Sequence, residues 1–528
     1  NIEDNLTLDS SLKFIEFQNN GQLAKSSGKT LTFSDQELIA PDAMYILKND
    51  SGTFAGTINN DSVSVHWFGA TGDGTTDDEI AIEAAITFSR AGGTITFISG
   101  LTYQTDTINI SKQIRLFGGH LRAKDDIGGN GVIELAATAD DSVVENMTIE
   151  VPVTVTGGGG NVAGIKVHTA TDRVRIGNCV FSCSSLLGAV YGRNSTGLIV
   201  ENCVFKDTPP ARYAIFIVGM VGCVITNCII IDGADYGIKV DGGEDNHISG
   251  CVIRNATGDG INAGGTTSNL SIIGNTITGC YTRGISLSSG VDDVVISGNN
   301  IRDSGAEGIM VSDDADGVVI SGNSITDEIT GIEIIALAND VVIYGNVLSG
   351  NTTAISDLGG TNVKISGNVG YETVFRSRIV EDNGVDGHSL GADKWTSVKF
   401  NQEALAADFA SIDVATGIIT LAAGTYDYRY DVSVTNATST TDRVVFRLYS
   451  ITDEAAIPDS QSLSALIGNG VINNHTTMSR GRITFSVSTV IKLEAWADDV
   501  SGMGLAAAAD PSGDAPDEVY ALFDIWRP

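Results

Sequence analysis

A series of residues suited to acid–base chemistry recurs about every 24 residues in the middle of the chain. Each member directly precedes a Gly-Ile pair, or an Ala-Ile pair in the first case, and the members are Tyr213, Tyr236, Asp259, Arg283, Glu307 and Thr330. If consecutive repeats pair as neighbouring strands, residues at one phase are about 4.8 Å apart and form a stripe. Such a stripe predicts a groove for an extended polymer.

The carboxylates of this series have spacings that suit glycoside hydrolysis. Asp259 and Glu307 are two repeats apart, about 10 Å at the backbone, and carboxyl groups roughly 6.5–9.5 Å apart suit an inverting glycosidase. Asp235 and Asp259 are one repeat apart, near the roughly 5 Å of a retaining pair. We predict Asp235, Asp259 and Glu307 as catalytic residues, with both stereochemical outcomes open.

The other side chains of the region suit substrate binding. Arg283 lies between two carboxylates, where it could hold a substrate oxygen or keep one carboxylate ionised. We predict substrate contacts from Arg212, Tyr213, Tyr236, Lys239, Asn262 and Arg283. Asp241 and Glu333 also face outward, as sugar contacts or as a merely polar face. An elimination reaction, with Tyr236, Lys239 or Arg283 as the base, is the alternative chemistry.

A second phase of the repeat indicates the architecture. One position is Cys in four successive units (Cys179, Cys203, Cys228, Cys251) and Asn in the next five (Asn275, Asn299, Asn323, Asn346, Asn368). Identical residues at a fixed period stack on neighbouring turns of a solenoid. Runs such as Gly237-Ile-Lys-Val240 alternate as strands do. The sequence therefore predicts an all-β, single-stranded right-handed parallel β-helix with buried, reduced cysteines and a hydrogen-bonded asparagine ladder.

The chain divides into three predicted regions. Residues 1–60 are polar and irregular, and we predict a neck region there. Residues 61–375 form the β-helix, with a capping helix at about 77–90 whose Thr76 and Glu79 make a capping box. Residues 376–528 carry alternating strands between Gly and Asp turns, which predicts an antiparallel jelly-roll sandwich.

Composition excludes several classes of partner. The 528 residues have a net charge of −34, so nucleic acid and anionic membranes are poor partners. No apolar run approaches the roughly 20 residues of a membrane span, so we predict no membrane insertion. Asp313, Asp314 and Asp316 lack a full calcium-ligand spacing, and we predict no metal and no cofactor. The first residue is Asn, so we expect a missing N-terminal part.

Two segments carry family resemblances. Phe68-Gly-Ala-Thr-Gly-Asp-Gly-Thr-Thr-Asp-Asp78, followed by Ala81-Ile-Glu-Ala-Ala-Ile86, resembles the N-terminal signature of the pectate-lyase-like superfamily, which includes bacteriophage tailspikes and polygalacturonase-type enzymes. Asp259-Gly-Ile261 is similar to the Asp-Gly step of the latter, but their later Asp pair and His have no counterpart here. The runs from Asp413 to Gly417 and from Ala423 to Tyr430 resemble the C1q/TNF-like jelly roll, which is typically trimeric.

Together these resemblances imply a phage tailspike depolymerase. It would bind and cleave a bacterial surface polysaccharide (capsule, exopolysaccharide or O-antigen). It would be a homotrimer in the virion, acting outside the host cell and joined to the phage baseplate or tail through the missing N-terminal part. The alternatives are a polysaccharide lyase on the same groove and a non-catalytic glycan-binding fibre or adhesin, which would leave the polymer intact.

Overall fold

The computed structural model contains two compact units, Asn1–Tyr371 and Glu372–Pro528. In the first unit the structure describes residues 4–370 except 10, 19–20, 25–26, 49–52, 125–126, 128–129, 153–161, 184–186, 207–212 and 233. In the second unit it describes residues 374–382, 396–398, 402–405, 410–413, 418–436, 441–453, 455–457, 462–467, 473–497, 503–505 and 517–526.

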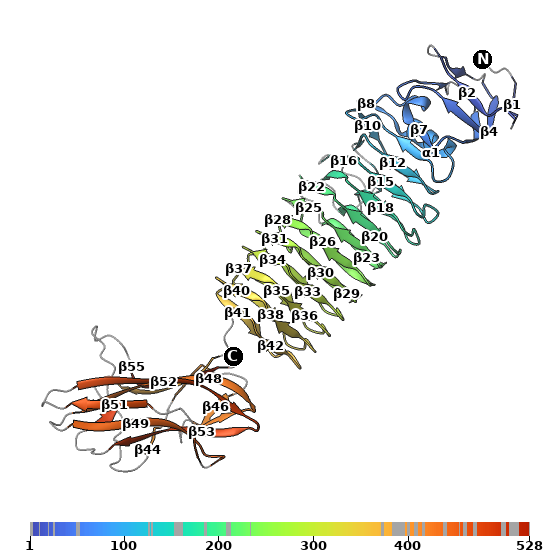
Figure 1. The fold of residues 1–528 in the computed structure, drawn as a ribbon. Coiled ribbons are helices and arrows are strands. Elements are labelled where there is room, and N and C mark those ends of the chain that lie inside the picture. The colour runs from blue at the N-terminus through green and yellow to red at the C-terminus, as the bar shows by residue number, and fades with distance from the viewer. Residues whose placement is uncertain are drawn as a thin grey trace. The chain divides into compact units, whose positions relative to one another are not determined.

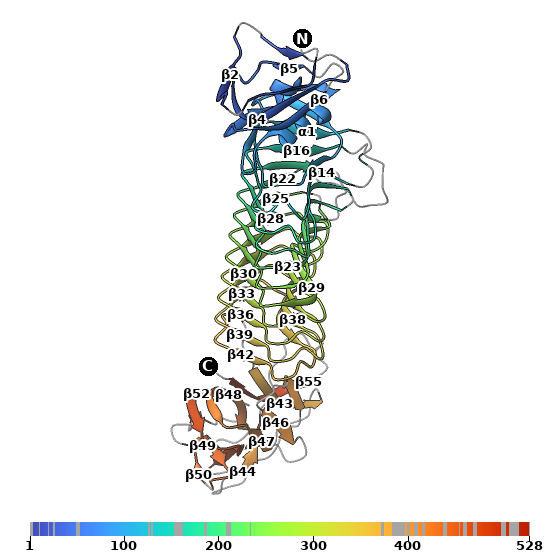
Figure 2. The same cartoon turned by 90° about the vertical axis from the view of Figure 1, so that its right-hand side faces the viewer.

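The first unit is an all-β, right-handed parallel solenoid of about 14 turns that covers residues 6–366. Figures 1 and 2 show its coils stacked one on the next from the blue to the yellow part of the chain. Three long parallel sheets run through the coils. Sheet B extends from β8 (Asp73–Asp77) to β40 (Val347–Ser349), and sheet C from β7 (Ser62–Ser64) to β42 (Lys364–Ser366).

Sheet A contains the predicted site and has eleven strands. Its strands are β11 (Ile108–Ile110), β14 (Gly131–Leu135), β17 (Ala163–Val167), β20 (Gly188–Arg193), β23 (Tyr213–Val221), β26 (Tyr236–Glu244), β29 (Ile261–Ser268), β32 (Ile285–Leu287), β35 (Glu307–Val311), β38 (Thr330–Ile334) and β41 (Thr353–Asp357).

Stacked apolar side chains fill the interior of the coils. Ile238, Ile261 and Ile285 pair in register across sheet A, and none of them is exposed. Phe181 and Phe205 stack with ring centroids 4.8 Å apart at an interplanar angle of 5°. Each buried side chain of this size contributes roughly 1.5–3 kcal/mol of transfer free energy. The core therefore runs the length of the solenoid and leaves outward positions free to vary.

The predicted cysteine ladder is confirmed. All seven cysteines are free thiols and buried. In the ladder, Cys179 and Cys203 each donate a thiol hydrogen bond to the carbonyl two residues earlier, at 3.3 Å. Burial raises the pKa of Cys183, Cys223 and Cys280 to about 12. A buried thiol with a raised pKa is a poor nucleophile.

The asparagine ladder is also confirmed. The Asn299 Oδ1 atom accepts from both the backbone N–H and the Nδ2 of Asn275, at 2.8 and 3.0 Å. Asn323 and Asn346 continue the same pattern, and Asn368 ends it. Each Nδ2 also donates to a carbonyl of the preceding coil, as Asn299 does to Ile272 at 2.9 Å. Buried polar groups are thereby satisfied from coil to coil.

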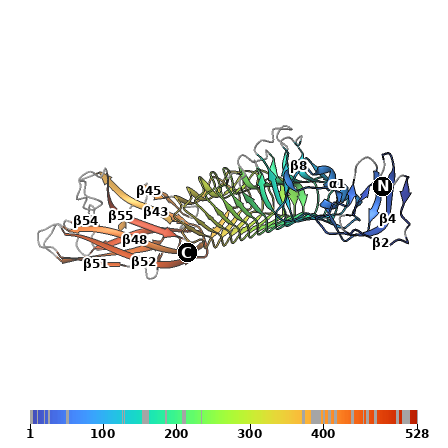
Figure 3. The same cartoon turned by 90° about the horizontal axis from the view of Figure 1, so that it is seen from above.

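The helix α1 (Glu79–Phe88) lies near the N-terminal end of the unit, where it contacts β6 (Thr53–Ile58) and β11 (Figure 3). The predicted capping box is wrong. The N-cap is Asp78, and its side chain makes no capping hydrogen bond. Its carboxylate instead accepts from the backbone N–H groups of Thr71 and Gly72, at 2.6 and 3.1 Å. Asp78 of the signature therefore stabilises the loop at Thr71 and Gly72 rather than the start of the helix.

Parallel pairing also extends into the first 60 residues. The strand β4 (Thr30–Ile39) pairs in parallel with β6, with β1 (Leu6–Thr7) and with β2 (Phe14–Glu16). The predicted boundaries at 60/61 and 375/376 stay predictions. None of the described helices is long and apolar enough to cross a membrane.

The second unit contains two antiparallel sheets. The strands of one sheet, in spatial order, are β45 (Gln402–Leu405), β43 (Val374–Asp382), β55 (Asp517–Trp526), β48 (Gly424–Asn436) and β52 (Asn473–Phe485), with β54 (Met503–Leu505) on β48. Those of the other are β46 (Ala410–Asp413), β47 (Ile418–Leu421), β53 (Thr489–Ala497), β49 (Thr441–Ser450) and β50 (Ala455–Ala456), with β44 (Thr396–Val398) on β53 and β51 (Ser462–Ile467) on β49. The jelly roll and the trimer stay predictions.

Candidate functional site

The outward stripe consists of Tyr213, Tyr236, Asp259, Arg283, Glu307 and Thr330, and these residues occupy one phase of sheet A. Tyr213 pairs in register with Tyr236, and Glu307 with Thr330. Asp259 and Arg283 precede their strands, and their carbonyls accept from Gly237 and Gly260 of the preceding coil at 3.1 and 2.9 Å. The backbone ladder therefore continues through the whole stripe.

Arg283 joins two of the three predicted catalytic carboxylates. Its Nε donates to Glu307 Oε2 at 2.6 Å, and its guanidinium lies 3.9 Å from Asp259 Oδ1. The side chains of Asp259 and Glu307 are only 5% and 15% exposed. One guanidinium therefore lies beside both carboxylates and is hydrogen-bonded to Glu307.

Asp259 differs from its prediction in one respect. The stripe is predicted to face a groove, but the whole Asp259 residue is only 3% exposed. Its carboxylate accepts hydrogen bonds from Asn262 Nδ2 at 2.8 Å and from the hydroxyl of Thr282. These partners come from its own strand and from the next coil, so Asp259 is held inside a network.

Lys239 and Asn262 extend this network along the sheet. The Lys239 Nζ donates to Asn262 Oδ1 and lies 6.0 Å from the centre of the Tyr236 ring. Partial burial lowers the pKa of the Lys239 amine, while the charges of Asp241 and Asp259 oppose this shift. The sheet thus presents an amine that loses its proton more readily than an ordinary lysine.

Glu333 is an acidic group whose role sequence reasoning left open. Partial burial raises the pKa of its carboxyl, and repulsion from Glu307 raises it further, while Arg283 opposes the shift. Glu333 and Glu307 lie on adjacent strands, β38 and β35. Glu307 is bound to Arg283, whereas the pKa of Glu333 is raised, and unequal environments of this kind suit an acid and a base.

Aromatic rings lie beside the polar cluster. The rings of Tyr213 and Tyr236 stack, with centroids 5.6 Å apart and an interplanar angle of 24°. The centroid of the Tyr213 ring lies 4.4 Å from that of Phe216. Phe216 in turn lies 5.5 Å from Tyr191. Aromatic faces in a row suit the apolar faces of sugar rings.

Two predicted residues are not brought into the cluster. Asp235 is exposed and accepts a hydrogen bond from the Thr257 hydroxyl at 3.2 Å. Arg212 lies outside the described residues.

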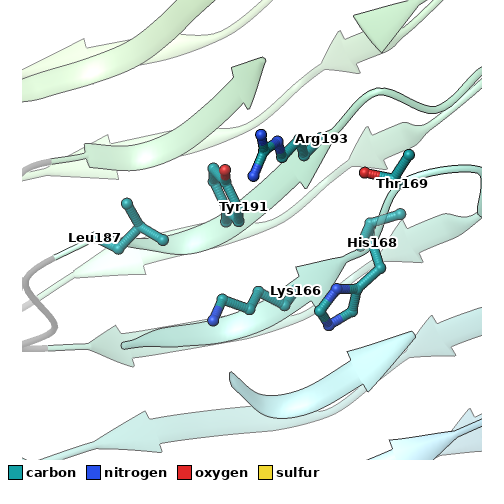
Figure 4. Close-up of a pocket in the computed structure, with 7 residues that line it drawn as sticks. Lys166, His168, Thr169, Leu187, Tyr191 and Arg193 are labelled. Atoms are coloured by element: carbon teal, nitrogen blue, oxygen red, sulfur yellow. The ribbon is translucent and has the colours of Figure 1, made fainter. Parts of the chain in front are cut away.

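A second polar group on sheet A was missed at the sequence level. Lys166, His168, Tyr191 and Arg193 line a pocket of about 270 Å³, together with Val167, Thr169 and Leu187 (Figure 4). None of these residues is among the predicted site residues. Outward-facing side chains also recur three residues after the stripe position in each coil. Inspection of that second position in the sequence could have found this group.

Comparison with known proteins gives one partial family match and several structures that are similar in fold. The profile of one family, described as "Periplasmic copper-binding protein (NosD)", matches residues 178–373, which is less than half of the chain. No curated protein sequence matches the chain. Within the described residues there is no cluster of three or more His, Cys, Asp or Glu side chains that could hold a metal ion.

Several solved structures are similar in fold. The A-module of the mannuronan C-5 epimerase AlgE6 of Azotobacter vinelandii is 18% identical, covers 58% of this chain and 98% of its own, and gives a TM-score of 0.48. The tailspike protein of Escherichia coli bacteriophage HK620, in complex with a pentasaccharide, is 13% identical over 82% of this chain and 93% of its own, with a TM-score of 0.48. The GH87 alpha-1,3-glucanase of Streptomyces thermodiastaticus is 17% identical over 59% and 69%, with a TM-score of 0.46.

Proposed function

We propose that this chain binds an extended bacterial surface polysaccharide along the outward face of sheet A and hydrolyses its glycosidic bonds beside Glu307 and Glu333. The observation that carries the proposal is the pair of carboxyl groups with unequal environments. The Glu307 carboxyl is bound by the Arg283 guanidinium at 2.6 Å, whereas partial burial and Glu307 raise the pKa of Glu333. This division supplies an acid and a base at the same pH.

In the proposed reaction Glu333 is the general acid. Its proton passes to the glycosidic oxygen as the bond from that oxygen to the anomeric carbon breaks. Glu307 accepts a proton from the water that attacks the anomeric carbon, because one of its oxygens is bound to Arg283 and the other can accept. The Glu307 proton returns to solvent and Glu333 is reprotonated, which closes the cycle.

Asp259 has a positioning role in this proposal. Its hydrogen bonds to Asn262 and Thr282 and its 3.9 Å approach to Arg283 fix the groups that face the substrate. A side chain that is 5% exposed contacts little substrate itself. This burial favours positioning over the catalytic role that the sequence predicts for Asp259.

The aromatic row would hold the polymer. From Tyr191 on β20 to Glu333 on β38, sheet A advances by six strands, or about 29 Å. Tyr191, Tyr213 and Tyr236 would stack on sugar rings, and Lys239 and Asn262 would bind hydroxyl groups.

The finer assignment is a phage tailspike. The signature at residues 68–86 and the two antiparallel sheets of the second unit support it. In this proposal the second unit is a jelly roll that assembles a homotrimer, and the protein acts in the virion, outside the host cell.

A polysaccharide lyase is the second candidate, and Lys239 favours it. Partial burial lowers the pKa of its amine, so a larger neutral fraction could remove the proton beside the carboxylate of an acidic sugar. The products would then carry unsaturated, ultraviolet-absorbing ends, which hydrolysis does not form.

Digestion of capsule and lipopolysaccharide from a panel of bacteria tests the proposal. We expect shorter polymers with new reducing ends and no new ultraviolet absorbance, and a loss of this activity in Glu333→Gln. Absorbing product ends would favour the lyase. A polymer that is bound but keeps its length would identify a non-catalytic adhesin and overturn the hydrolase.

A further inference from the structure

The pocket beside Tyr191 lies on the same line of residues as the proposed catalytic cluster. Direct register pairs join Glu134 to Lys166, Lys166 to Tyr191, Tyr191 to Phe216, Phe216 to Lys239 and Lys239 to Asn262. We call these six residues the central file. The pocket therefore opens on the proposed groove, at its N-terminal end.

Cationic side chains converge on this pocket. Figure 4 shows Lys166 on one strand, His168 just beyond the end of that strand, and Tyr191 and Arg193 on the next strand, and all four line one pocket. Arg193 is exposed and has no ion-pair partner among the residues that the structure describes. In a chain with a net charge of −34, a concave site rich in cations is unusual.

Glu134 organises the cations. Its Oε1 accepts from the backbone N–H of Gly131 at 3.0 Å and lies 3.6 Å from Lys166 Nζ. Its Oε2 lies 3.0 Å from His168 Nε2. One carboxylate thus holds two donors at the rim of the pocket, while the Arg193 guanidinium keeps its fork of N–H groups for a ligand.

We propose that this pocket binds the anionic group of an acidic sugar in the polysaccharide, as a specificity subsite separate from the catalytic cluster. This inference rests on the proposed function and names the substrate class. Arg193 binds the anion through paired N–H donors, Lys166 adds a compact positive charge, and the Tyr191 ring stacks on the sugar. The anion is a sugar carboxylate, or a phosphate or sulfate substituent.

The position of the pocket gives this inference a length scale. Lys166 and Asn262 are four strands apart on sheet A, or about 19 Å, which an extended chain of about four sugars spans. An acidic sugar held at Arg193 would therefore place the bond that breaks a fixed number of sugars away. Digestion should give oligosaccharides with their acidic residue at a constant distance from the new end.

Direct binding measurements on the intact protein test the subsite without requiring catalysis. The probes are methyl glucuronoside, glucose 6-phosphate, glucose 6-sulfate and the neutral methyl glucoside, measured by titration with NMR detection. We expect at least one anionic probe to bind ten-fold or more tighter than methyl glucoside, and the three anions distinguish carboxylate, phosphate and sulfate. Equal affinity for all four probes overturns the inference.

Matched variants locate the binding. Arg193→Gln should weaken binding of the anionic probe about ten-fold, whereas Arg254→Gln, an exposed arginine of sheet B (β28, Val252–Arg254), should leave it unchanged. Glu333→Gln should also bind normally. An equal loss in both arginine variants would indicate a general charge effect and overturn the subsite.

If anions bind as expected but no polymer is cut, the subsite stands and the hydrolase fails. If the wild type already cuts the polymer at irregular distances from the acidic sugar, and Arg193→Gln cuts it at the same rate, the hydrolase stands and the subsite fails.

Discussion

The inner asparagine ladder and the outward stripe belong to the same coils but follow opposite rules. Asn275, Asn299 and Asn323 repeat one residue type, and each is bonded to the next. Over the same stretch the outward stripe changes from Asp259 to Arg283 to Glu307. Stacking dictates the inner residue, because an unmatched buried amide would lack partners. Nothing in the fold dictates the outer one, so irregularity on the surface of a repetitive fold points to binding or chemistry.

The largest effect on activity is expected from a substitution of an outward-facing residue of sheet A. We expect Glu333→Gln to lower turnover of the polysaccharide by about 10²-fold or more, because proton donation to the leaving oxygen is lost. The midpoint of thermal unfolding should change little. Kinetics of reducing-end release on purified polymer give the measurement.

Glu244→Gln is the matched control, because it removes an exposed carboxylate at the end of β26. Its turnover should equal that of the wild type. Near-normal activity in both Glu333→Gln and Glu307→Gln would move the chemistry away from this cluster.

An inner substitution should have the opposite profile. Asn299→Ala leaves the Asn275 amide and the Ile272 carbonyl without their partners, at about 2–4 kcal/mol of unfolding free energy. Turnover of the protein that remains folded should be unchanged. Asn300→Ala, one position along on an exposed site, should have little effect in the same denaturant titration. Equal stability of the two variants would mean that the ladder is not structural.

The buried carboxyl of Glu328 extends the comparison, because its contribution to stability depends on pH. Glu328 is 3% exposed, one of its oxygens has no hydrogen-bond partner among the described residues, and burial raises its pKa to about 7. A raised folded-state pKa contributes stability that is complete below the unfolded value, near 4.5, and is lost as the pH rises through about 7. Stability should therefore be greater at pH 5 than at pH 8.

Glu328→Gln isolates this contribution from the general charge of the chain. The difference in unfolding free energy between pH 5 and pH 8 should shrink by up to about 3 kcal/mol in the variant. Thermal unfolding at the two pH values gives the comparison, and an unchanged difference would show that Glu328 ionises without cost in the folded protein.

The smallest effect is expected in the cysteine part of the inner ladder. Thiols are weak hydrogen-bond donors, and Cys203 fills space much as a small apolar side chain does. Cys203→Ala should cost about 1 kcal/mol, well below Asn299→Ala. Thiol reagents should label the native protein only slowly, and rapid labelling of Cys203 would contradict the inward register.

The fold could be predicted from the sequence because one residue type recurs at the same position of successive repeats. It also placed Asp259, Arg283 and Glu307 on one stripe, since phase determines position in a solenoid. It could not find the burial of Asp259, because the Thr282 hydroxyl that covers it comes from the next coil. The unequal environments of Glu333 and Glu307 likewise depend on packing between coils.

The pocket was missed for a related reason. Gly188 occupies the phase of Tyr213 on its coil, so the series that began at Tyr213 gave no sign of Tyr191 or Arg193 three and five residues later. The predicted capping box was wrong because the spacing of these residues is compatible with two hydrogen-bonding patterns. Asp78 binds the backbone of Thr71 and Gly72 instead.

The asparagine ladder also bears on how long the folded protein survives. A coil between Asn275 and Asn346 cannot open alone, because its asparagine supplies the acceptor for one neighbour and uses the acceptor of the other. Opening therefore proceeds from a terminus of the row, where Asn368 accepts from Asn346, and a protease meets an intact interior until that terminus frays. The lifetime of the folded protein is then governed by its last coil rather than by its average one.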